Sequence, residues 1–202
     1  GASSVTTMTT PGTGTVFGIW GSTPADVWAV GGLTGFVWRF DGTTWTDVPL
    51  PAGHPGAAVF KVWGTAADDV WLCGLAGTLM HWDGSALSMV ASPSTRSFFT
   101  IHADGDDVVA VGGAGSGVVV EAGADGVFAD VTPDLAPQMN GVWLTGDGRG
   151  WAVGFQGEML RRAAAGEWAS FDPGIAIRHD LHAVWVDPAG GLWAVGGEIL
   201  AE

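Results

Sequence analysis

The sequence predicts an all-β protein assembled from five copies of one four-stranded unit. A short aromatic phrase recurs along the 202 residues, and its anchors are Trp20, Trp63, His102, Trp143 and Trp185, which are 39 to 43 residues apart. The 34 glycines are scattered through the chain, as expected for many short strands joined by tight turns. A repeat of about 40 residues that contains several strands and no 3.6-residue apolar rhythm is typical of a β-propeller.

Each unit divides into four strands, which in the first unit read VFGIW, DVWAVG, GFVWRF and TWTDVPL. Asp41-Gly42 separates the last two strands, and this pair suits a tight turn because both residues tolerate positive φ. The second strand is apolar on both alternating faces, so we expect it inside the sheet, with most tryptophans in the core. We expect its closing glycine to let the chain leave the sheet in a tight turn. We expect its leading acid (Asp26, Asp69 or Asp107) to bond to nearby backbone N–H groups.

The ends of the chain suggest how the ring closes. The fifth unit lacks a fourth strand, whereas residues 4–11 precede the first unit and end in proline, as the other fourth strands do. We expect this amino-terminal strand to pair beside residues 198–202 and to close a ring of five four-stranded antiparallel blades. The alternative is that the chain is a fragment of a propeller with six to eight blades. The predicted blades are residues 16–58, 59–97, 98–138, 139–180, and 181–202 together with 1–15.

The stretch VWGTAADDVWLCGLAGTLMHWDGSAL, residues 62–87, resembles the W-G-(S/T)-x-x-D-V-W-A-V-G repeat of bacterial, myxobacterial-type β-propellers. It is more distantly similar to Asp-box and photosystem II assembly-factor propellers. The resemblance covers the whole chain and is best in the first two units, whereas the third has His102 and Val109 in place of tryptophans. Such repeats abound in secreted and lipoprotein-like sequences, so the resemblance implies a secreted, cell-envelope or periplasmic protein of a bacterium. It does not imply a function, because propellers serve many unrelated roles.

Composition and charge disfavour several classes of partner. Seven basic against 21 acidic residues give a net charge of −14, which disfavours nucleic acid and anionic membrane surfaces. No apolar run reaches the roughly 18 residues that a membrane helix needs. The one cysteine, Cys73, cannot form an intramolecular disulfide, and we expect a buried, inert thiol on the second strand of the second unit. We expect this protein to be a monomer, because a closed ring leaves no blade face unpaired.

No catalytic set stands out, so we expect that the protein is not an enzyme. Tyrosine is absent, which excludes a sialidase-type mechanism with a tyrosine nucleophile. Other propeller glycosidases need carboxylates in the axial funnel, which the first strand of each unit lines. The middle positions of these strands carry no carboxylate; they are Gly18, Lys61, Thr100, Gly141 and Ala183. A propeller glycosidase is therefore the least favoured alternative.

The sequence favours a binding or scaffold module that recognises a protein or a glycan through its loop face or central funnel. The candidate ligand-binding residues in the funnel are Lys61, Thr100, His102 and His182. We expect no cofactor and favour a solvated acidic turn; the alternative is a calcium site formed by Asp104, Asp106 and Asp107. A lectin with a pocket between each pair of blades is the second hypothesis. It would need near-identical residues in every unit, and the loops differ.

Overall fold

The computed structural model describes residues 7–197 as an all-β chain with one short 3-10 turn, η1 (Phe155–Gly157). The first sheet contains β1 (Val16–Thr23), β2 (Asp26–Gly31), β3 (Phe36–Phe40) and β4 (Trp45–Asp47). The second contains β5 (Val59–Ala66), β6 (Asp69–Gly74), β7 (Leu79–Trp82) and β8 (Leu87–Met89). The third contains β9 (Phe98–Asp104), β10 (Asp107–Gly113), β11 (Gly117–Ala122) and β12 (Ala129–Asp130). The fourth contains β13 (Met139–Thr145), β14 (Arg149–Gly154), β15 (Met159–Arg162) and β16 (Trp168–Ser170), and the fifth contains β17 (Leu181–Val186) and β18 (Leu192–Gly196).

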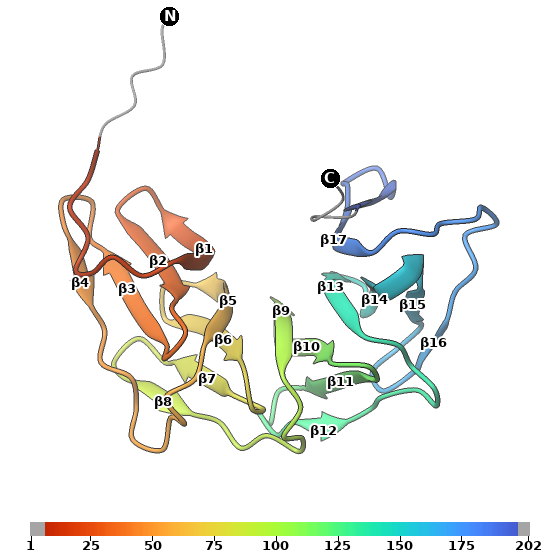
Figure 1. The fold of residues 1–202 in the computed structure, drawn as a ribbon, viewed down its shortest axis with the longest axis horizontal. Helices are drawn as coiled ribbons and strands as arrows, with labels where there is room; N and C mark the ends of the chain where they lie inside the picture. Colours follow the sequence, from red (N-terminus) through yellow and green to blue (C-terminus); the bar gives the residue numbers. More distant parts are fainter. Residues whose placement is uncertain (1–6, 198–202) are drawn as a thin grey trace, which may run out of the picture.

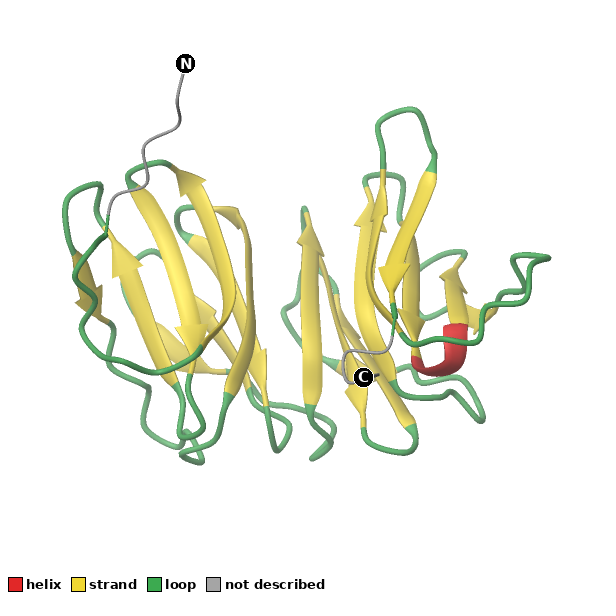
Figure 2. Cartoon of the chain, turned by 45° about the horizontal axis from the view of Figure 1, so that its top comes forward, coloured by secondary structure: helices red, strands yellow, loops and turns green. Residues whose placement is uncertain are grey.

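The five sheets, which we call blades, are arranged radially. Figure 1 shows the first strand of each blade towards the middle, with β4, β8, β12 and β16 at the periphery. Each blade is an antiparallel meander in which every strand pairs with the next one along the chain. The inner strands β1, β5, β9, β13 and β17 contact one another in that order, and Figure 2 shows the blades standing side by side. The repeat period predicted from the sequence thus corresponds to one blade.

The glycine that ends the second strand serves a purpose other than the predicted turn. A Cβ on Gly74 would lie well inside 3.0 Å of Ala58 O, in the chain that enters the same blade. The next residue, Leu75, donates its N–H to that carbonyl at 2.9 Å. The same close approach and bond recur in every blade, at Gly31, Gly112, Gly154 and Gly196. The glycine is required because the main chain passes where a side chain would begin.

The leading acid of the second strand also behaves differently from the prediction, because it bonds to side chains and not to backbone N–H groups. Asp26 accepts from Arg39 Nε at 2.6 Å. Asp69 accepts from Trp71 Nε1 at 2.9 Å and contacts His81 Nε2 at 2.7 Å. These carboxylates bind groups on the second and third strands, so they hold the blade together at one rim.

A buried ionic network joins the third and fourth blades. Arg162, on β15, is 1% exposed. Its guanidinium donates to Glu121 and Asp107 of the third blade at 3.0 Å each, and to Gly148 O at 2.6 Å. Trp168 Nε1 also donates to Glu121, at 3.1 Å. Every charge in this network has an opposite charge or a hydrogen-bond partner, as a buried ion pair requires.

The predicted ring closure does not hold for the described residues. The prediction pairs residues 4–11 with residues 198–202; of these two segments, residues 4–6 and 198–202 lie outside the described chain. Residues 7–11 lie beside Thr43–Asp47 at the outer edge of the first blade. They are directed there because Gly12 lies against the Trp38 ring and Thr15 O accepts from Gly32 N at 3.0 Å. The first and fifth blades lie at the two ends of an open arc (Figure 1).

Candidate functional site

A β-bulge at the same place in every inner strand shapes the centre of the arc. In β1, Val16 pairs with Gly31 and Gly18 with Val30, so Phe17 is the extra residue. A bulge re-aims the side chain of the residue that it adds. The five bulged residues are Phe17, Phe60, Phe99, Asn140 and His182. The adjacent apolar pairs Val-Phe, Val-Phe and Phe-Phe break the alternation of a regular strand, and this was the sequence signal that could have revealed them.

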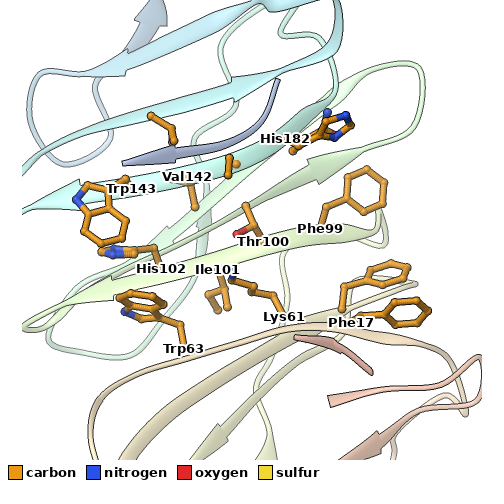
Figure 3. Close-up of a pocket in the computed structure, with 15 residues that line it drawn as sticks. Phe17, Lys61, Trp63, Phe99, Thr100, Ile101, His102, Val142, Trp143 and His182 are labelled. Atoms are coloured by element: carbon orange, nitrogen blue, oxygen red, sulfur yellow. The ribbon is translucent and has the colours of Figure 1, made fainter. Parts of the chain in front are cut away.

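The bulged residues border a cavity of about 250 Å³ in the centre of the arc. All four residues predicted for the funnel line this cavity: Lys61, Thr100, His102 and His182. Figure 3 shows Lys61 and Thr100 between the phenylalanines on one side and the ring of His102 on the other. His182 Nε2 lies 3.1 Å from Gly197 O, so its ring is already engaged within the fifth blade. Sequence reasoning missed the phenylalanines and assigned Trp63 and Trp143 to the core.

Among the described residues that line this cavity, Lys61 is the only lysine or arginine. It is half-buried on β5, and no ion pair joins its ammonium to a carboxylate of the described residues. Thr100, the equivalent residue of the next inner strand, is 7% exposed and adds a hydroxyl. The equivalent residues of β13 and β17 are Gly141 and Ala183, whose small size leaves space in the cavity opposite Lys61 and Thr100. The arrangement suits an anionic group, because Lys61 brings a positive charge to the cavity and none of the described residues that line it is a carboxylate.

His102 forms the floor of the cavity between two tryptophans. Its ring centroid lies 4.4 Å from that of Trp63 and 4.3 Å from that of Trp143. Burial, assisted by the charge of Lys61, lowers the pKa of His102 to about 3, so the ring is neutral near pH 7. Nδ1 accepts from Leu144 N at 3.2 Å, which leaves the proton on Nε2. Nε2 is buried and has no hydrogen-bond partner in the described chain.

A second, wider cavity lies on the other side of these three rings. It has a volume of about 770 Å³ and shares Trp63, His102 and Trp143 with the first. Its rim carries Asp104 and Asp187, so the two sides differ in charge. The shared aromatic residues therefore separate an acidic mouth from the chamber that contains Lys61.

The three residues predicted as calcium ligands are not gathered around one point. Asp104 lines the wide cavity, Asp106 lines a groove near His81, and Asp107 is paired with Arg162. Across residues 7–197, no three His, Cys, Asp or Glu side chains are placed to hold a metal ion. In the same part of the chain, no helix has the length and apolar character to cross a membrane.

No family model matches the sequence, and no curated protein matches it. Solved structures do match. A structure described as YCF48 bound to D1 peptide is 19% identical with a TM-score of 0.67, over 93% of this chain and 63% of that one. YCF48 from Cyanidioschyzon merolae is 18% identical with a TM-score of 0.65, over 91% of this chain and 65% of that one.

A third match, the WD40 β-propeller domain of Doa1, is 9% identical with a TM-score of 0.67, over 91% of this chain and 62% of that one. This chain thus spans less than two thirds of the length of these three structures. Likeness at such low identity shows the fold alone. The chain has the architecture of a β-propeller, in which four of the described blades are four-stranded antiparallel sheets.

Proposed function

We propose that this chain is a non-catalytic binding propeller that holds an extended polypeptide segment in its central cavity, with a carboxylate of that segment against Lys61. The observation that carries the proposal is the unpaired ammonium of Lys61 in a half-enclosed, aromatic-lined chamber. An anionic ligand group would supply the charge partner that the described chain does not provide. The carboxylate can be a carboxyl terminus or an acidic side chain.

Two further features favour a peptide as the ligand. Phe17, Phe60 and Phe99 form a row in which neighbouring ring centroids are 5.5 and 5.8 Å apart. Such a row suits an apolar or aromatic side chain next to the carboxylate. The Nε2–H of His102 is buried without a partner, which costs about 1–3 kcal/mol, and a peptide carbonyl would pair with it once the flanking Trp63 or Trp143 ring moves aside.

The comparisons support this proposal only in outline, since a matching propeller is described as bound to a peptide. The cavity lacks the pair of facing carboxylates that glycoside hydrolysis uses, which supports a binding role. The lectin alternative, with five equal pockets, has no support in the bulged positions, because these differ between blades. We further propose a location outside the cytoplasm, which rests on the resemblance of the repeat alone.

The test uses a library of short peptides that carry Phe next to a terminal or side-chain carboxylate, each prepared with a free and with an amidated carboxyl terminus. Binding is followed through tryptophan fluorescence, because Trp63 and Trp143 line the cavity. We expect Lys61→Met to weaken binding of the best peptide at least tenfold. Arg178→Met is the matched control, since it removes one positive charge from an exposed position outside the cavity.

Equal binding by the Lys61→Met variant and the wild-type chain would contradict the proposal. So would a library in which no peptide binds. Binding of glycans alone on an array, competed by a monosaccharide, would favour the lectin alternative instead.

A further inference from the structure

The four junctions between neighbouring blades share one composition. In each, two residues of the second strand of one blade pack in a single apolar cluster with two residues of the inner strand of the next. Trp28 and Val30 cluster with Val59 and Val62 between the first two blades. The other three sets are Trp71 and Cys73 with Phe98 and Ile101, Val109 and Val111 with Met139 and Val142, and Trp151 and Val153 with Leu181 and Val184.

The first blade has the inner-strand half of such a junction, and within residues 7–197 no second half packs on it. Val16 and Ile19 occupy the positions of Val59 and Val62, as the pairing of β1 and β5 with their neighbours shows. Val59 and Val62 are fully buried, whereas Val16 is 46% and Ile19 63% exposed. We call Val16 and Ile19 the first-blade face.

The fifth blade has the other half. Trp193 and Val195 occupy the positions of Trp28 and Val30, which are fully buried. In the fifth blade these side chains are 60% and 63% exposed. Trp193 Nε1 donates to Asp187 at 2.9 Å, so its ring is fixed much as the ring of Trp71 is by Asp69. We call Trp193 and Val195 the fifth-blade face.

We propose that the fifth-blade face of one copy of this chain packs on the first-blade face of a second copy, and so reproduces the blade junction between molecules. The two faces are the matching halves of an interface that the chain itself forms four times. They lie at opposite ends of an open arc, so they do not cover each other within one molecule (Figure 1). Large exposed apolar side chains on a preformed sheet face mark an association surface.

The contact joins two different surfaces, so it is heterologous and can continue from copy to copy. This differs from the sequence-based expectation of a monomer, which depended on a closed ring. It also gives a test that separates the proposed pairing from other modes of association. A chain altered on one face keeps the other face intact, so two singly altered chains can pair once and then stop.

Sedimentation velocity over a wide range of protein concentration measures the association. We expect the wild-type chain to form dimers and larger species as concentration rises, and Ile19→Asp and Trp193→Asp each to remain monomeric. An equimolar mixture of these two variants should form a dimer and nothing larger. Leu33→Asp, which alters an exposed apolar residue outside both faces, should associate like the wild type.

Val16→Asp and Val195→Asp repeat the experiment at the second residue of each face, should either first variant fold poorly. A wild-type chain that stays monomeric at every concentration would overturn the proposal. The two faces would then be surfaces for a blade that does not belong to a second copy of this chain. Association of either single variant alone would overturn it too, because it would indicate pairing of like faces or another surface.

Discussion

Replacing Gly112 by alanine tests the idea that the closing glycine is required by a passing main chain. Gly112 ends the part of β10 that pairs with β9, in the third blade, and its φ is not in the left-handed region. The added Cβ would lie 2.8 Å from Phe98 Cα and still closer to Ser97 O. Ser97 O also accepts from Gly113 N at 2.9 Å, so the carbonyl cannot move away without losing that bond.

The expected loss follows from these contacts. Overpacking a tight site costs typically 1–3 kcal/mol, and the lost main-chain bond adds about 1 kcal/mol. Alanine restricts the unfolded chain and returns about 0.4–1 kcal/mol. The net loss should be about 1–3.5 kcal/mol, or a fall in Tm of roughly 2–14 °C for a chain of this size.

Urea unfolding followed by tryptophan fluorescence measures this difference. Gly123→Ala is the matched control, because its Cβ meets nothing within 4 Å and its φ is also outside the left-handed region. If Gly112→Ala and Gly123→Ala were within about 0.5 kcal/mol of each other, the close approach would not explain the glycine.

Two further predictions concern buried groups. Cys73 is fully buried on β6, and burial raises the pKa of its thiol, so a thiol reagent should label the native chain far more slowly than the urea-unfolded chain; equal rates would contradict the packing. Arg162→Met should lower the free energy of unfolding by about 3–5 kcal/mol, because Glu121 is left buried without its cation. Adding Glu121→Gln to Arg162→Met should recover part of that loss, and a double variant less stable than the single one would refute this explanation.

The fold could be predicted from the repeat, because each unit places similar residues at the same structural positions. The period, the four strands and the inner position of the first strand follow from apolar alternation and Asp-Gly turns. The same reasoning brought Lys61, Thr100, His102 and His182 together in one cavity. These positions could be predicted because equivalent residues of inner strands must converge in a radial arrangement.

Other features depend on contacts between segments that a repeat does not encode. The passing carbonyl that excludes a side chain at Gly74 belongs to Ala58, which precedes the unit, so a turn was the simpler reading. The path of residues 7–11 depends on packing of Gly12 against Trp38, which the proline pattern did not indicate. Trp63 and Trp143 were assigned to the core because a tryptophan that packs in the core and one that lines a cavity give the same pattern in the sequence.

The pH dependence of stability tests the state of His102 that the binding proposal requires. Its pKa is lowered from the usual 6.5 to about 3 in the folded chain, chiefly by burial. As the pH falls below about 6.5, the unfolded chain binds a proton at this ring and the folded chain does not. The free energy of unfolding is therefore unaffected by protonation of this ring above about pH 6.5 and falls progressively as the pH decreases towards 3. Comparing urea unfolding of the wild type and of His102→Gln from pH 7 to pH 4.5 isolates this contribution from that of the carboxylates. We expect the wild type to lose up to about 1.4 kcal/mol per pH unit more than the variant. Equal slopes would mean that the folded chain protonates His102, and the Nε2–H would then no longer be the donor of a neutral ring.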